Sequence, residues 1–126
     1  MPKTVPNLPG LEPGPFPFSQ VVEANGLVFV AGQVGSAPDG HGPVPGGIEA
    51  ETRQMLDNVG RLLRIVGLDY RDVVKATVYL RDFADFAAMN TIYREYFPAE
   101  PPTRATVGVT ALAADYRAEI EVIAAR

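Results

Sequence analysis

The chain has 126 residues, of which 47% are hydrophobic and 21% are charged, as is typical of one globular domain spanning residues 1–126. It contains no cysteine, which excludes disulfide bonds, a thiol nucleophile and cysteine-ligated metal sites. The net charge is −4 and the pI about 4.9, and without a cluster of Lys and Arg we expect no nucleic-acid binding. No signal-like or membrane-spanning apolar run is found, so a soluble cytoplasmic protein is expected.

The N-terminal third predicts an arm, a hairpin and a loop. Residues 1–16 are rich in proline and lack a hydrophobic period, which indicates an extended arm. Two strand-like segments, 17–24 and 27–33, flank an Asn-Gly pair, the strongest two-residue signal for a β-hairpin. The Gly/Pro-rich loop that follows holds the only histidine, His41. No neighbour would orient its ring, so we expect an exposed turn residue and not a catalytic base.

The middle of the chain predicts two helices separated by a strand. Residues 48–66 carry apolar side chains at three- and four-residue spacing, and Gly67 is a typical helix C-cap. Residues 73–80 alternate as a strand does, with Val74 on the inward face. Asp82 can cap a second helix that runs through Phe97.

Two further strands, 103–109 and 118–124, complete the chain. Alternation places Arg104 and Thr106 on one face of the first strand. If the two strands pair as an antiparallel hairpin, one register brings both residues close to Glu119. The charges would then form either a surface ion pair or a shared pocket, and alternation alone favours the ion pair.

The resulting order is strand, strand, helix, strand, helix, strand, strand. One sheet with both helices on one face is the simplest α+β arrangement of these elements. The opposite face would carry Val, Ala and Thr with little charge. Such a face on so small a domain predicts burial against other subunits.

Four stretches of the sequence carry a resemblance to a known family. They are Phe18-Ser19-Gln20, Ala31-Gly32-Gln33, residues 85–93, and the last two strands with their Pro-Pro-Thr-Arg-Ala-Thr and Ala-Glu-Ile-Glu-Val-Ile-Ala segments. Together they resemble the RidA family, also called the YjgF family, which includes enamine/imine deaminases. The resemblance implies a chorismate mutase-like fold and a homotrimer whose sheets close into a central barrel.

The resemblance also implies roles for individual residues. Arg104 falls where the deaminases bind the substrate carboxylate, a role that suits the guanidinium fork. Glu119 matches the acidic residue that positions the attacking water and can relay protons. The remaining substrate-binding positions, with no metal ligand among them, are Phe18, Ala31, Gly32, Asn90, Ala105 and Thr106. For Asn90 a solvated helix position, and for Gly32 a structural role at the end of its strand, are open alternatives.

Three of these positions depart from the family pattern. Phe18 stands where tyrosine is usual, Ala31 where serine is common, and Thr106 where the best-known members have cysteine. The first two changes remove hydroxyl groups and make the pocket less polar. They bear on the range of substrates more than on the reaction.

The expected activity is cofactor-free hydrolysis of reactive 2-imino or enamine acids to 2-keto acids and ammonia, a form of metabolite damage control. Two other classes of function are open. A non-catalytic module that binds small carboxylates and regulates a partner would use the same pocket residues. A nuclease, a label given to some family members, is disfavoured by the acidic pI. A pathway-specific relative, such as an aminomuconate-type deaminase, is a further enzymatic alternative.

Overall fold

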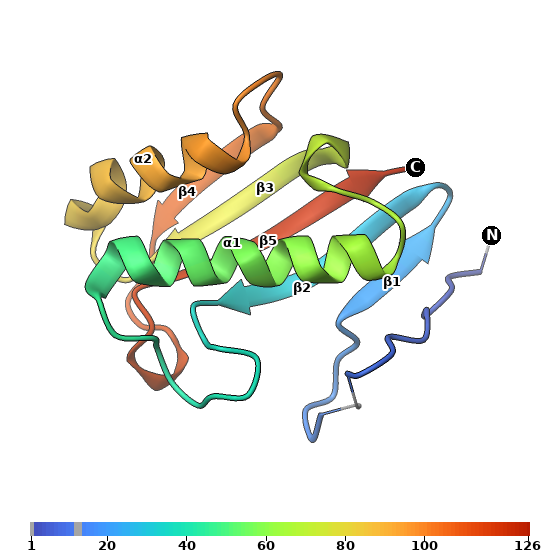
Figure 1. Cartoon of the computed structure of the whole chain (residues 1–126), viewed down its shortest axis with the longest axis horizontal. Helices are drawn as coiled ribbons and strands as arrows, with labels where there is room; N and C mark the ends of the chain where they lie inside the picture. The colour runs from blue at the N-terminus through green and yellow to red at the C-terminus, as the bar shows by residue number, and fades with distance from the viewer. Residues whose placement is uncertain (1, 12–13) are drawn as a thin grey trace.

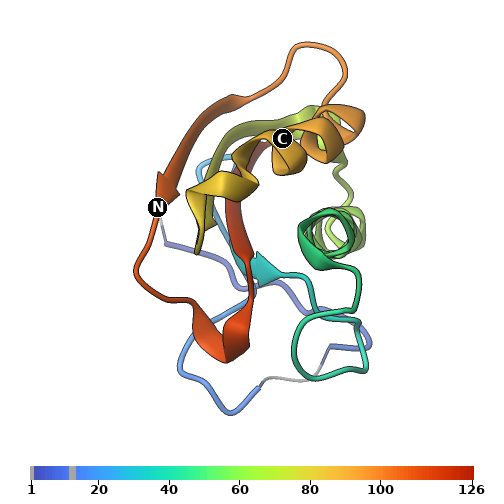
Figure 2. The same ribbon diagram turned by 90° about the vertical axis from the view of Figure 1, so that its left-hand side faces the viewer.

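A five-stranded mixed sheet with two helices on one face forms the body of the molecule (Figure 1). The computed structural model describes residues 2–11 and 14–126. Viewed from the side, both helices lie on the same side of the sheet and leave its other face, here called the open face, without a helix (Figure 2). The α+β architecture expected from the order of elements is therefore confirmed.

The first two strands form the hairpin that the Asn-Gly pair predicts. β1 (Val21–Ala24) pairs antiparallel with β2 (Leu27–Val34), and Asn25 and Gly26 both have positive φ, 52° and 77°. A type I′ turn needs positive φ at both central positions, which is why this pair of residues directs the chain back on itself. The N-terminal arm bonds to the edge of this hairpin, since Thr4 exchanges backbone hydrogen bonds of 2.9 and 2.8 Å with Glu23.

Helix α1 (Gly47–Ile65) covers the middle of the sheet (Figure 1). It ends as predicted: Gly67 adopts φ of 83° and its N–H bonds to the carbonyl of Arg64 at 3.1 Å. Its apolar stripe is fully buried against the sheet, where it packs on the inward side chains of the central strands. The buried stripe residues are Met55, Leu56, Val59, Leu62 and Leu63.

Strand β3 (Val73–Leu80) has the predicted bounds but a different inward face at its start. Val74 is 45% exposed, whereas Val73 is buried, so the expected inward position of Val74 is wrong. The cause is an irregularity in the register between Val73 and Lys75, opposite the last strand. One extra residue in a strand reverses the alternation of the side chains that precede it.

Helix α2 (Phe86–Tyr96) follows a short 3₁₀ turn, Phe83–Asp85. Asp82 caps that turn, because its carboxylate accepts a 2.9 Å hydrogen bond from the N–H of Ala84. The inward side of α2, with Met89 and Tyr93, is buried over the far edge of the sheet.

The sheet order is β1-β2-β5-β3-β4, and it corrects the expected C-terminal hairpin. β4 (Thr103–Gly108) pairs in parallel with β3, and β5 (Ala118–Ala125) lies between β2 and β3 and pairs antiparallel with both. The two C-terminal strands are thus separated by β3 and do not pair with each other. The physical reason is the helix between β3 and β4, because a crossover of this kind joins parallel strands.

His41 is exposed, in agreement with its interpretation as a loop residue. Within the described residues, no helix is both long and apolar enough to cross a membrane. The assignment of residues 1–126 to one domain stays a prediction.

Candidate functional site

Arg104 lies on the helix-covered face of the sheet. In the parallel register Arg104 stands beside Ala76 and Thr106 beside Val78, and both neighbours are fully buried under the helices. The two residues therefore share a face, as alternation predicts. The guanidinium carbon of Arg104 lies 4.6 Å from the ring centre of Tyr93 and 5.7 Å from that of Phe86. Among the described residues, its N–H groups have neither a hydrogen-bond nor an ion-pair partner.

Two hydroxyl groups close to this arginine are also unpaired. The hydroxyls of Thr106 and Tyr93 are buried and have no hydrogen-bond partner among the described residues. Burial raises the pKa of the Tyr93 hydroxyl, and the nearby charge of Arg104 opposes that shift. Buried polar groups without partners are uncommon and costly, so the Thr106 hydroxyl, on the same face of β4 as the free guanidinium, marks a place where a ligand can supply the missing partners. We name Arg104 and Thr106 the arginine half-site.

Glu119 lies on the other, open face. The register of β5 with β3 places it beside Tyr79, while its neighbours Ala118 and Ile120 point into the core. Burial raises the pKa of the Glu119 carboxyl above its ordinary value of 4.5, and the charge of Glu121 raises it further. A raised pKa means that the carboxyl holds its proton to higher pH than an ordinary glutamate, which favours proton exchange with a substrate.

The Glu119 side chain occupies the space where residue 32 would place a side chain if it were not glycine. A methyl group at position 32 would lie 2.9 Å from the carboxyl carbon of Glu119 and closer still to one of its oxygens. Any larger side chain would therefore displace the carboxylate. Gly32 and Glu119 form the second half-site, named here the glutamate half-site.

The two half-sites lie on opposite faces of the same sheet. The expected pairing of Arg104 with Glu119 is therefore wrong within one chain, and so is the expectation that Glu119 is the partner of the free arginine. The correction follows from the sheet order: β3 separates the two strands, and its register sets Arg104 level with the buried Val122 and not with an outward residue of β5. A carboxylate bound by Arg104 can meet Glu119 only if a second copy supplies one of the two residues.

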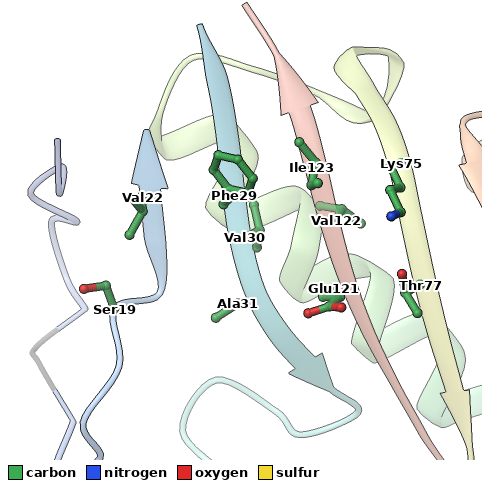
Figure 3. A pocket seen from close by; sticks show the side chains of 10 residues that line it. All are labelled: Ser19, Val22, Phe29, Val30, Ala31, Lys75, Thr77, Glu121, Val122 and Ile123. Atoms are coloured by element: carbon green, nitrogen blue, oxygen red, sulfur yellow. The ribbon is translucent and has the colours of Figure 1, made fainter. Parts of the chain in front are cut away.

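The other predicted substrate-binding residues divide between these faces. Ala31 lines a shallow pocket of about 360 Å³ on the open face, together with Ser19 and Phe29 (Figure 3). Ala105, between Arg104 and Thr106 on β4, alternates to the open side and is exposed. Asn90 is half-buried on α2, directly after the buried Met89. Phe18 is 58% exposed in the segment before β1, where its ring stacks on Phe16 at 6.3 Å.

The open face is more polar than the sequence predicts. Figure 3 shows Lys75, Thr77 and Glu121 on β3 and β5, next to the apolar Phe29 and Ile123. The Tyr79 hydroxyl, on the same face, donates a 2.8 Å hydrogen bond to Glu121, which raises the pKa of that tyrosine. The expectation of a face with little charge is therefore wrong, although Phe29 and Val107 leave large apolar side chains exposed there, at 39% and 42%.

A buried acid fixes the start of β5, close to the glutamate half-site. Glu51 of α1 is only 3% exposed, and its carboxylate accepts a 2.8 Å hydrogen bond from the backbone N–H of Arg117. The Arg117 side chain lies 3.8 Å from Glu51 and 3.4 Å from Asp85, so it joins α1 to the turn before α2. The contact anchors the backbone two residues before Glu119.

Sequence reasoning missed the roles of Glu51 and Tyr93. Glu51 falls in the first turn of the predicted helix 48–66, where the helix dipole favours an acid, and Tyr93 falls on the apolar side of the second predicted helix. Tyr93 is indeed buried, but its ring also supports Arg104. Helical spacing could have predicted the burial of Glu51. Met55 and Val59 follow it at four-residue steps, so the three residues lie on the same buried side of α1. Within the part of the chain that the structure describes, no group of His, Asp and Glu side chains is arranged to hold a metal ion.

The fold places the chain among small α+β proteins with an open mixed sheet and two helices on one face. The family model described as Endoribonuclease L-PSP matches residues 12–126, so the chain belongs to that family, the RidA family indicated by the sequence. The chain is 34% identical to a protein of the conserved Rid family from Yersinia pestis, and the two structures superpose with a TM-score of 0.90 over 99% of this chain and all of that one.

Two curated relatives match 86% of this chain. Reactive Intermediate Deaminase A, chloroplastic, from Arabidopsis thaliana is 45% identical, and this chain covers 58% of its length. The 2-iminobutanoate/2-iminopropanoate deaminase of Capra hircus is 44% identical, and this chain covers 79% of it. Both matches extend over 108 residues, which is most of the chain.

Proposed function

We propose that this protein hydrolyses 2-imino acids, or their enamine tautomers, to 2-keto acids. Water adds to the C=N carbon, and the resulting tetrahedral intermediate loses ammonia to leave the keto group. The reaction balances with water alone, so the proposal includes no cofactor. The observation that carries it is the free guanidinium of Arg104, which meets aromatic rings and no acid among the described residues.

Arg104 is the proposed carboxylate-binding residue. A planar guanidinium binds a carboxylate with two parallel hydrogen bonds, and such charge-assisted pairs are stronger than neutral ones. The Thr106 hydroxyl lies on the same face of β4 and lacks a partner, so it can bond to the same substrate or to a water beside it. We also propose that Asn90 and Ala105 contribute to substrate binding.

Glu119 is the proposed residue that positions water and transfers protons. In its ionised form it accepts a proton from the attacking water, and in its protonated form it can donate to the departing nitrogen. Burial raises its pKa, and this shift supports both roles because it makes the protonated form easier to reach than in an exposed glutamate. Gly32 holds open the space for this carboxylate.

We further propose that the active protein is a homotrimer with its sites between subunits. Support comes from the position of the two half-sites on opposite faces of the sheet, which leaves each chain with two incomplete sites. The exposed Phe29 and Val107 on the open face also favour contact with another copy. A micromolar sample that scatters light as a monomer would contradict this assembly.

A coupled assay tests the proposed reaction. An amino-acid oxidase generates imines from a panel of amino acids, and the protein should accelerate the formation of keto acid. Arg104→Ala should abolish this acceleration and also weaken pyruvate binding. A protein that binds pyruvate through Arg104 but does not accelerate hydrolysis would be the carboxylate-binding module instead.

The nuclease named in the family description is not favoured for this chain. Its net charge of −4 and pI of about 4.9 oppose binding to a polyanion. Location in the cytoplasm is proposed on the sequence alone.

A further inference from the structure

The guanidinium of Arg104 lies against aromatic rings, while two acids at the ends of α2 are paired with other arginines. Asp85, directly before α2, lies 3.4 Å from Arg117, and Glu95 on α2 lies 2.9 Å from Arg53. Arg104 instead faces Tyr93 and Phe86, both on α2. The two rings attract the positive charge through their π faces.

This form of support has a consequence for ligand binding. A carboxylate partner would hold the guanidinium by its N–H groups, and a substrate would have to compete for those same groups. An aromatic face attracts the cation without using any N–H donor. The ring can therefore fix the position of Arg104 while all of its donors remain available to a substrate carboxylate.

Tyr93 is well placed to give this support because its own position is fixed. The residue is 6% exposed, and its ring packs against that of Phe97 with centres 4.7 Å apart. Its ring centre is 4.6 Å from the guanidinium carbon, closer than the 5.7 Å of Phe86. The Tyr93 hydroxyl has no partner among the described residues, so the contact with Arg104 is made by the ring.

We propose that Tyr93 is a positioning residue for the deamination reaction: its ring holds Arg104 in the orientation that binds the substrate carboxylate. This proposal rests on the proposed function. It assigns the ring, and not the hydroxyl, as the part of Tyr93 that matters. It therefore predicts different results for variants that remove one or the other.

The test compares Tyr93→Phe, Tyr93→Leu and Leu62→Ala in pyruvate binding by calorimetry, in kcat and KM for imine hydrolysis, and in thermal stability. Tyr93→Leu should weaken pyruvate binding about 3- to 30-fold, the range expected for a partly desolvated cation–π contact. Tyr93→Phe should bind pyruvate within about twofold of wild type. Leu62→Ala removes a buried side chain from α1 and leaves both rings beside Arg104 in place, so it should lower the melting temperature but leave pyruvate binding unchanged.

A shape-matched variant keeps the test valid if Tyr93→Leu does not fold. Pentafluorophenylalanine at position 93 has nearly the shape of phenylalanine but withdraws electrons from the ring face, so it should weaken pyruvate binding as the loss of the ring does. The proposal is overturned if this variant binds pyruvate like Tyr93→Phe, or if Tyr93→Phe loses as much affinity as Tyr93→Leu.

Arg104→Ala, measured in parallel, tests the role of Arg104 separately from the role of Tyr93. If Arg104→Ala loses pyruvate binding while Tyr93→Leu and the fluorinated variant retain it, only the role of Tyr93 is wrong. If Arg104→Ala binds pyruvate like wild type, the carboxylate-binding role of Arg104 is wrong and the role of Tyr93 is overturned with it.

Discussion

Replacing Gly32 with alanine should impair catalysis with little effect on stability. The added methyl group would lie 2.9 Å from the carboxyl carbon of Glu119 and 3.3 Å from its Cγ, whereas an ordinary contact begins at 3.4 Å. The carboxyl carbon must therefore retreat by about 0.5 Å, and the oxygen nearer to the methyl group by more. A misplacement of about 1 Å in a catalytic group can cost about 100-fold in rate.

We expect Gly32→Ala to lower kcat for imine hydrolysis about 10- to 100-fold, which corresponds to about 1.4–2.7 kcal/mol in activation free energy. Gly32 has no positive φ, so alanine is compatible with its backbone, and the half-buried Glu119 side chain can rotate away. The free energy of unfolding should change by less than about 0.5 kcal/mol.

The assay is the coupled oxidase reaction with kcat and KM determined separately. Gly14→Ala is the matched control, because a methyl group at position 14 meets no atom within 4 Å. Pyruvate binding should be nearly unchanged in both variants, because the proposed partner of the carboxylate is Arg104 and neither change alters that residue. Wild-type kcat in Gly32→Ala would refute the assignment of Glu119 as the residue that handles water.

Three further predictions follow from the charged groups and the altered pocket. Burial and the charge of Glu121 both raise the pKa of Glu119, so activity that needs the Glu119 carboxylate should fall as the pH drops through that raised pKa. In Glu121→Gln the fall in activity should occur at lower pH. An unchanged pH profile in this variant would contradict the coupling between the two carboxyl groups. Glu51→Ala should destabilise the protein by about 2–4 kcal/mol in denaturant unfolding, because it leaves the Arg117 N–H unpaired, whereas Glu95→Ala, which breaks an exposed ion pair, should cost less than about 1 kcal/mol. Because Phe18 and Ala31 carry no hydroxyl group, imines from Leu or Met should be hydrolysed with a higher kcat/KM than the imine from Ser, a difference of about 1–3 kcal/mol in activation free energy. A preference for the Ser imine would contradict this.

The features that sequence predicted well are those decided by neighbouring residues. The Asn25-Gly26 turn and the Gly67 cap require backbone angles that few other residues adopt, so the sequence alone specifies them. The shared face of Arg104 and Thr106 follows from strand alternation and needs no knowledge of the sheet.

The order of strands could not be read from such local signals. The last two strands were expected to pair because they are adjacent in sequence, but β5 pairs with β2 and β3. Two signals opposed that hairpin: residues 109–117 form a connection longer than a tight turn, and a strand–helix–strand unit ending in β4 predicts parallel pairing with β3. The positions of Arg104 and Glu119 on opposite faces depend on this order.

The role of Tyr93 was hidden for a different reason. A tyrosine on the apolar stripe of a helix is compatible with a purely structural role, and the periodicity of α2 predicts its burial correctly. Its contact with Arg104 comes from a residue on another element, brought close by the parallel pairing of β3 and β4. Only the packed structure brings the two together.

In the proposed trimer a complete site takes Arg104 from one copy and Glu119 from another. Subunit complementation tests it most directly. Arg104→Ala and Glu119→Gln are each purified alone, and are then co-expressed with different affinity tags so that mixed oligomers can be isolated. Each variant alone should be inactive in the imine assay. In each isolated mixed trimer one of the three interfaces combines an intact Arg104 with an intact Glu119, so these trimers should recover about one third of wild-type activity. Mixed oligomers that stay as inactive as the separate variants would contradict a site shared between two copies.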